Sequence, residues 1–174
     1  MDKITLLISE DDIKKRVSEM AKLISEDYKG EKITIVSVLK GAFIFTADLI
    51  RSINNETDIN FIRAKSYIDT QSSGDVKISD DFDLNVKNKR IIIVEDIIDT
   101  GKTLLELKEY FYRMGCKDVK IAVFLDKPSR RTADISPDYC CFEIEDKFVV
   151  GYGLDYNEKY RQLPYLGILN PDGN

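Results

Sequence analysis

The chain has 174 residues, of which 43% are hydrophobic and 33% are charged, the composition of an ordinary soluble globule. This length predicts one domain over residues 1–174, large enough to fold without a disulfide or a structural metal. No apolar run reaches membrane-span length and no signal peptide is recognisable, so we expect a cytoplasmic protein that does not contact a membrane. The formal charge of −5 argues against a nucleic-acid surface, which needs clustered Lys and Arg.

The residue types available for chemistry are limited, because the chain has three cysteines and no histidine. The cysteine count is odd and no C-x-x-C occurs, which argues against a disulfide framework or a zinc site. We therefore expect Cys116, Cys140 and Cys141 to be small buried side chains in a reducing compartment. Without histidine, acid–base chemistry must use Asp, Glu, Lys, Tyr or Cys.

The first half of the chain predicts strands that alternate with helices. Residues 4–8 indicate a short strand, and Ser9 with Asp12 three positions later is typical of a capped helix start. The helix that follows has one apolar face, formed by Ile13, Val17, Met20, Ala21, Ile24 and Tyr28. Residues 33–39 then indicate a buried strand, and residues 42–53 a second, largely buried helix.

In the second half, residues 57–67 alternate as a half-exposed strand does, and two polar loops follow at 69–75 and 80–90. Buried strands are predicted from residue 91 and at 119–125, with a helix at about 103–114 between them. The strand-rich tail from residue 139 onward is expected to fold over one end of the sheet. The predicted fold class is therefore α/β: a parallel central sheet flanked by helices, with a small strand-rich hood.

The stretch "IIIVEDIIDTGKTL", residues 91–104, begins as a core strand and ends in three acids and a phosphate-type turn. In open α/β sheets ligands bind at the carboxyl ends of strands, and the free N–H groups of a helix start suit a phosphate. A Walker motif is excluded because it needs glycine where Asp96 stands. Carboxylates beside one phosphate site suit sugar hydroxyls or hydrated Mg²⁺, which favours a ribose 5-phosphate. The alternative is a charged loop in which Asp99 only caps the helix.

This stretch resembles the phosphoribosyl pyrophosphate motif of the type I phosphoribosyltransferases. Four further stretches resemble the bacterial hypoxanthine-guanine phosphoribosyltransferase family: "SVLKGAFIFTADLIR", "AKSYIDTQSSGDVKI", "FLDKPSRR" and "DKFVVGYGLDYNEKYRQLPYLGIL". The similarity covers residues 38–169 in the family's order. It implies the type I phosphoribosyltransferase fold, a Mg²⁺ cofactor and a homodimer or homotetramer. The implied reaction is transfer of phosphoribose from phosphoribosyl pyrophosphate to hypoxanthine or guanine, giving IMP or GMP and pyrophosphate.

The resemblance also implies roles around the sugar. Glu95 and Asp96 would face the ribose hydroxyls and magnesium-bound water, and Asp155 would help to bind the magnesium. The residues implied for the 5-phosphate are Asp99, Thr100, Gly101, Lys102 and Thr103. The residues implied for the pyrophosphate are Lys40, Gly41 and Arg161.

On the purine side, the resemblance implies that Asp99 is the base at N7 and that Lys127 donates to the 6-oxo group. Phe148 would stack on the ring, which a planar base favours, and the main chain of Val149 would read the Watson–Crick edge. Taken without the resemblance, Phe148 is more typical of a core residue, and Lys127 is more typical of a solvated loop. Lys40 and Gly41 could likewise form a plain connection.

Some positions stay outside this assignment or depart from the family's pattern. Ser66 and Tyr67 would open a mobile lid, but Ile68 stands where relatives often have glycine, so the lid could be stiffer. Cys141 replaces a small glycine and puts local packing in doubt. The pair Arg130 and Arg131 is interpreted as a solvated face. Two rivals are a nucleic-acid-binding regulator of the same fold, and a related enzyme that uses orotate or adenine.

Overall fold

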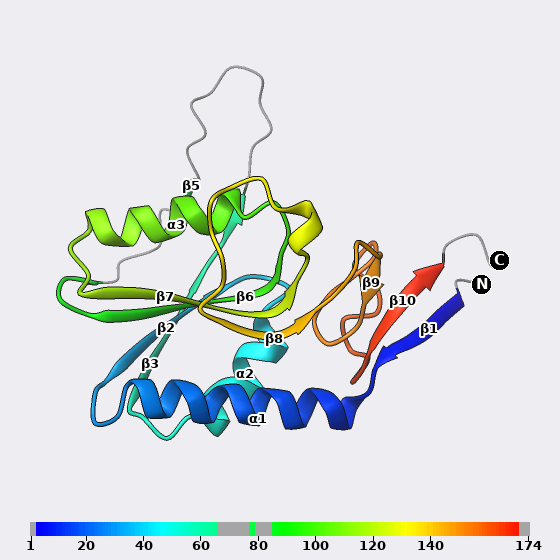
Figure 1. The fold of residues 1–174 in the computed structure, drawn as a ribbon, viewed down its shortest axis with the longest axis horizontal. Helices are drawn as coiled ribbons and strands as arrows, with labels where there is room; N and C mark the ends of the chain where they lie inside the picture. Colours follow the sequence, from blue (N-terminus) through cyan, green and yellow to red (C-terminus); the bar gives the residue numbers. More distant parts are fainter. Residues whose placement is uncertain (1–2, 66–76, 79–84, 171–174) are drawn as a thin grey trace, which may run out of the picture.

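A five-stranded parallel sheet forms the centre of the protein (Figure 1). The computed structural model describes residues 3–65, 77–78 and 85–170. The strand order is β3-β2-β6-β7-β8, and each neighbouring pair is parallel. The strand bounds are β2 Ile33–Val38, β3 Thr57–Ile62, β6 Arg90–Ile98, β7 Asp118–Asp126 and β8 Tyr139–Glu143. The predicted α/β class with a parallel sheet is confirmed.

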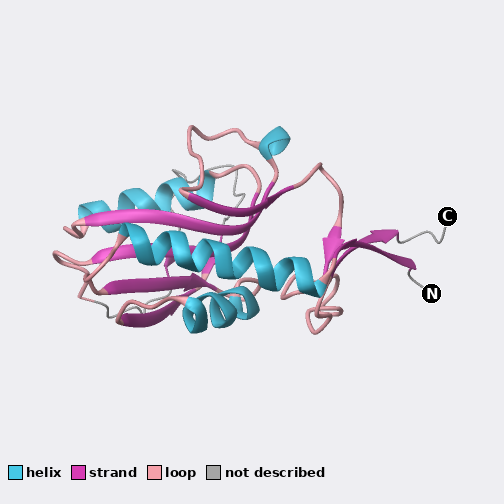
Figure 2. Ribbon diagram, turned by 60° about the horizontal axis from the view of Figure 1, so that its bottom comes forward, coloured by secondary structure: helices cyan, strands magenta, loops and turns pink. Residues whose placement is uncertain are grey.

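Helices cover both faces of this sheet (Figure 2). The helices α1 (Glu10–Asp27) and α2 (Phe43–Ser52) pack on one face, and α3 (Lys102–Arg113) packs on the other. At the start of α1, the hydroxyl of Ser9 accepts a hydrogen bond from the N–H of Asp12 at 3.1 Å, as the sequence predicts. No helix in the described part of the chain is long and apolar enough to cross a membrane.

A smaller antiparallel sheet forms the hood at one end of the molecule (Figure 1). Its strand order is β1-β10-β9, with bounds Lys3–Ile8 for β1, Leu166–Asn170 for β10 and Val149–Val150 for β9. The first strand of the chain therefore pairs with the last one, in the register Lys3 to Asn170. The predicted hood exists, but it takes one strand from the start of the chain.

The prediction that the whole tail folds over the end of the sheet is wrong for β8. This strand instead extends the central sheet, with Val123 of β7 in register with Cys140. Its side chains alternate, so that Tyr139 and Cys141 are buried in the core that α1 covers. The burial of Cys116 and Cys141 agrees with the sequence, whereas Cys140 is only partly buried. The side chain of Cys141 is 4% exposed, so the core accommodates it.

The segment predicted as one strand at 57–67 is two strands. The strand β3 ends at Ile62, and the short β4 (Ala64–Lys65) pairs antiparallel with β5 (Lys77–Ile78). The parallel partner β2 ends at Val38, opposite Ile62, so the parallel pairing stops there. Ser66, Tyr67 and Ile68, on which the lid prediction depends, lie outside the described residues.

Phe124 of β7 is the centre of a cluster of aromatic rings in the core. The side chain is fully buried, and its ring centroid lies 5.7 Å from Phe45 of α2 and 5.8 Å from Phe142 of β8. Tyr152, two residues after β9, contributes the nearest ring at 4.7 Å. Aromatic contacts at these spacings stabilise a core beyond the area that they bury.

Replacing Phe124 with alanine should therefore lower the free energy of unfolding by about 3–5 kcal/mol, the range for a buried phenylalanine. Phe43→Ala is the matched control, because Phe43 on α2 is 43% exposed, and it should cost less than about 1 kcal/mol. Urea unfolding of both variants measures the difference. Equal costs would show that the ring cluster does not carry the stability assigned to it.

Candidate active site

The chemically notable side chains gather where β2, β6 and β7 end. β6 delivers Glu95 and Asp96, and the connection to α3 delivers Asp99 and the turn at 100–103. Lys40 and Gly41 follow β2, after a cis peptide bond between Leu39 and Lys40. Lys127 follows β7 and begins the short 3₁₀ helix η1 (Pro128–Arg130). Parallel strands place their carboxyl ends at one edge, so these segments meet there as the sequence predicts.

The turn before α3 requires glycine at one position. Gly101 has a φ of +82°, and a Cβ there would lie 2.6 Å from Cγ2 of Ile135 and 2.9 Å from Cδ of Arg131. The first N–H groups of α3 have no partner within the helix. They border a cavity of about 180 Å³ whose lining residues are Val38, Glu95, Ile97, Ile98, Asp99, Thr100, Gly101, Thr103 and Leu104. The cavity thus combines backbone donors with acids.

Glu95 and Asp96 form a tightly coupled acidic pair. A carboxylate oxygen of Glu95 accepts from the N–H of Asp96 at 3.0 Å, and Asp96 accepts from the N–H of Ile97 at 2.6 Å. Burial raises the pKa of Glu95 well above its ordinary value, and the charge of Asp96 adds to the increase. Burial also raises the pKa of Asp96, while its hydrogen bonds and the cation of Arg161 oppose that shift. Approaching hydroxyl donors or a cation would favour the doubly ionised pair.

Two glycines let the surrounding loops approach this pair. A Cβ on Gly41 would lie 1.5 Å from the Oδ2 of Asp96, which leaves no room for any side chain. A Cβ on Gly153 would lie 2.2 Å from the carbonyl oxygen of Gly41. The loop after β9 therefore packs directly on the loop after β2, and that loop packs on the acid at the end of β6.

Arg161 borders the acids from the loop after β9. Its guanidinium donates to the carbonyl oxygen of Gly153 at 2.8 Å and pairs with Asp155 at 2.8 Å. Its Nε is the one buried side-chain donor or acceptor, among the residues described, that lacks a hydrogen-bond partner. Lys40 lies beside it, with both residues in contact with Glu158. The cations predicted for pyrophosphate are therefore brought together.

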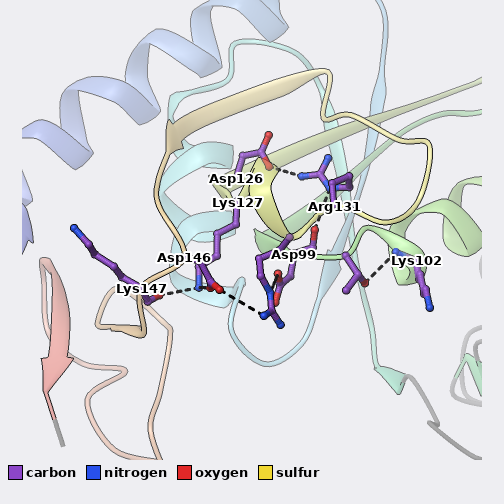
Figure 3. Close-up of polar contacts among 9 residues, drawn as sticks. Asp99, Lys102, Asp126, Lys127, Arg131, Asp146 and Lys147 are labelled. Carbon is purple, nitrogen blue, oxygen red and sulfur yellow. Dashed lines mark hydrogen bonds and ion pairs between the residues drawn. The ribbon is translucent and has the colours of Figure 1, made fainter.

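A second cavity, of about 430 Å³, opens toward the hood. Its lining residues are Asp96, Ile97, Asp99, Lys127, Arg130, Asp146, Phe148, Val149, Leu154 and Asp155. Lys127 is 8% exposed, and its ammonium donates to the carbonyl oxygen of Lys147 at 2.7 Å and to Asp146 at 3.4 Å (Figure 3). The reading of Lys127 as a solvated loop residue is therefore excluded.

Phe148 is 53% exposed at this cavity, so it is not a core residue. The ring of Tyr156 meets it edge-on, with centroids 5.6 Å apart. Val149 directly follows in β9 and is buried. An exposed aromatic ring beside a main-chain edge and a lysine donor is a suitable set for a flat heterocycle with polar edges.

The interpretation of Arg130 and Arg131 as a solvated face is wrong for Arg131. Its guanidinium donates to the carbonyl oxygens of Asp99 at 3.0 Å and Ile135 at 2.7 Å. It also pairs with Asp126 (Figure 3). Arg130 is half exposed but donates to the carboxylate of Asp99 at 3.0 Å. The sequence signal that could have placed both arginines at the site is their position just after a strand end, at the same edge as the acids.

No three Asp, Glu or Cys side chains gather as a ready-made metal cage in residues 3–65, 77–78 and 85–170. Asp155 accepts from the N–H of Glu158 at 2.9 Å in addition to pairing with Arg161. Asp155 and Asp96 nevertheless line the same cavity. Mg²⁺ usually uses one or two carboxylates together with water and substrate phosphates, and these two residues fit such a shared site.

Comparison with known proteins identifies the family to which the chain belongs. The model of the phosphoribosyl transferase domain matches residues 9–157. The hypoxanthine-guanine phosphoribosyltransferase of Bacillus subtilis is 48% identical over 167 residues, which cover 95% of this chain and 93% of the relative. The enzyme of the same name from Streptococcus thermophilus is 44% identical over 168 residues, covering 96% and 93%.

A crystal structure of a hypoxanthine-guanine phosphoribosyltransferase from Bacillus anthracis superposes with a TM-score of 0.90. It is 44% identical, and the match covers 98% of this chain and 100% of that one. Enzymes of this family generally use Mg²⁺ with phosphoribosyl pyrophosphate. The sheet, the strand-end turn and this degree of identity agree, and the chain belongs to the hypoxanthine-guanine phosphoribosyltransferase family.

Proposed function

We propose that the protein transfers the phosphoribosyl group of phosphoribosyl pyrophosphate to hypoxanthine or guanine, giving IMP or GMP and pyrophosphate in purine salvage. The observation that carries this proposal is that Asp99 lines both cavities. One cavity ends at the turn of Thr100 and Gly101, and the other ends at Lys127 and Phe148. A sugar phosphate in the first and a purine in the second would meet beside one carboxylate.

The first cavity supplies the contacts for the sugar phosphate. The turn of Asp99, Thr100, Gly101, Lys102 and Thr103 offers backbone N–H groups and hydroxyls for the 5-phosphate. Glu95, which lines this cavity, and Asp96, which lines the second one, accept hydrogen bonds from the ribose hydroxyls. A ribosyl-cation-like transition state is then stabilised by the carboxylates that surround it. Lys40, Gly41 and Arg161 face the departing pyrophosphate.

The second cavity supplies the contacts for the purine. The carboxylate of Asp99 takes the proton from N7 as the glycosidic bond forms at N9. The ammonium of Lys127 donates to the 6-oxo group, Phe148 stacks on the ring, and the main chain of Val149 reads the Watson–Crick edge. Arg131 fixes the main chain of Asp99 through the carbonyl oxygen that it binds at 3.0 Å.

Magnesium belongs to the proposal as a shared ligand of protein and substrate. Asp155 would bind it directly, and Glu95 and Asp96 would bind it through water. When bound, the ion offsets the charge of the leaving pyrophosphate and orients it. The acidic pair supports this assignment, since a nearby cation favours the ionised form that burial opposes.

The surroundings of the enzyme are also proposals. The three free cysteines suit the reducing cytoplasm. Assembly as a homodimer or homotetramer has support from the edge strand β3, where Ile59 is 42% and Phe61 52% exposed.

The reaction itself is tested by incubating the protein with phosphoribosyl pyrophosphate, Mg²⁺ and each of hypoxanthine, guanine, xanthine and adenine. Formation of IMP and GMP is the expected result, and the absence of nucleotide with every base would refute the proposal.

The role of Asp99 as the base predicts a loss of turnover when its carboxylate is removed. Asp99→Asn should retain phosphoribosyl pyrophosphate binding but lose roughly 10²–10⁴-fold in the chemical step, the usual contribution of a general base. Single-turnover kinetics measures that step. Asp134→Asn, at an exposed position of the loop before β8, is the control. Turnover within a few-fold of the wild type would remove Asp99 from the mechanism.

The role of Lys127 predicts how the enzyme rejects adenine. A lysine can only donate, and adenine presents a donor where hypoxanthine presents an acceptor. Lys127→Ala should therefore lower hypoxanthine activity far more than adenine activity in a competition assay. Lys147→Ala removes a neighbouring exposed side chain but retains the carbonyl oxygen that binds Lys127, so it should preserve the preference. Wild-type enzyme that uses both bases equally would contradict the assignment.

The contact between Gly41 and Asp96 predicts a sensitive glycine. In Gly41→Ala the added Cβ would overlap the Asp96 carboxylate, and displacing that group should lower kcat/KM for phosphoribosyl pyrophosphate by roughly 10²-fold. Gly30→Ala is the control, because Gly30 has a φ of +77° but nothing within 4 Å of its Cβ position. That variant should lose stability only. An unchanged kcat/KM in Gly41→Ala would show that the carboxylate position is unimportant.

A further inference from the structure

Glu158 has no role in the assignment above, yet its carboxylate lies between the two cations proposed for pyrophosphate. Both of its oxygens are 3.2 Å from the Nζ of Lys40. One of them is also 3.4 Å from Nη2 of Arg161. Lys40 comes from the loop after β2 and Arg161 from the loop after β9, so one carboxylate joins the two loops.

The backbone around Glu158 is unusual and well fixed. Asn157, Glu158 and Tyr160 have φ values of 51°, 61° and 77°, a region that residues with a Cβ seldom adopt. The N–H of Glu158 donates to Asp155 at 2.9 Å. Main-chain hydrogen bonds of 3.1 and 3.0 Å between Tyr156 and Lys159 close the turn. A turn that is kept in such a conformation by its surroundings is a recognised mark of a functional position.

We propose that Glu158 is an internal competitor of pyrophosphate, occupying the Lys40–Arg161 pair until the pyrophosphoryl group displaces it. This inference rests on the proposed function, in which those two residues bind pyrophosphate. A phosphoryl group carries more charge and more acceptor oxygens than one carboxylate. It would therefore take both cations from Glu158, and the returning carboxylate would help the product to leave.

Lys40 and Glu158 are exposed enough for another anion to replace the carboxylate of Glu158. The side chains of Lys40 and Glu158 are 59% and 65% exposed, and exposed ion pairs change an equilibrium by no more than about fivefold. Arg161 also retains a buried Nε without a hydrogen-bond partner in the described residues. The carboxylates that Arg161 touches therefore leave its donors incompletely used.

The test is the affinity for inorganic pyrophosphate with Mg²⁺ in Glu158→Gln, measured by calorimetry and as product inhibition. Loss of the competing charge should tighten pyrophosphate binding by about three- to fivefold. It should also lower KM for phosphoribosyl pyrophosphate by a similar factor and leave KM for hypoxanthine unchanged. Glu109→Gln removes the same charge from an exposed position of α3 and should change none of these values. Glu158→Asp retains the charge on a shorter side chain and should fall between the two.

Two further variants separate this inference from the proposed function. Lys40→Met and Arg161→Met should each weaken pyrophosphate binding, with folding checked by thermal unfolding. If they do so while Glu158→Gln binds pyrophosphate equally or more weakly than the wild type, the site assignment stands and the competitor role is refuted. If neither variant affects pyrophosphate binding, the assignment and the inference both fail.

Discussion

The site depends on a close approach of two loops and the end of strand β6 that only glycine permits. A Cβ on Gly153 would meet the carbonyl oxygen of Gly41, and a Cβ on Gly41 would meet the carboxylate of Asp96. The loop after β9 therefore packs directly on the loop after β2, and the loop after β2 packs directly on the carboxylate that β6 carries. This stacking brings Arg161 close enough to oppose the raised pKa of Asp96. It also forms a common wall for groups that come from distant parts of the chain.

Most of the acids described at this edge of the sheet already have a cationic partner. Asp99 has Arg130, Asp126 has Arg131, Asp155 has Arg161, and Asp146 has Lys127. Such pairing compensates for the repulsion that so many neighbouring carboxylates would otherwise produce. Glu95 and Asp96 are the exception, since burial opposes the ionised form of both, and this pair is where a divalent cation would contribute most.

The sequence predicts those parts of the fold whose signals are local. The buried runs of β2, β6 and β7, the capped start of α1 and the glycine turn before α3 are all readable from neighbouring residues. Residues placed by long-range pairing were missed. Arg131 lies 32 positions beyond the Asp99 carbonyl group that it binds, and Glu158 lies 118 positions beyond Lys40. The position of β8 was likewise missed, because a short strand of mixed residues does not reveal which sheet it joins. The roles of the individual site residues rest on proximity and chemistry and stay predictions.

The pairing of β1 with β10 has a consequence for how the protein matures. The strands β2, β3, β6 and β7 and their helices can associate while the chain is still being synthesised, since each finds its partners within the stretch already made. β1 must wait, because Lys3 pairs with Asn170, and closing so long a loop is slow. β9 shares that small sheet, so the wall that carries Val149 is completed last. A nascent chain would thus form the turn before α3 early, and the wall that carries Val149 only after residues 166–170 have been made.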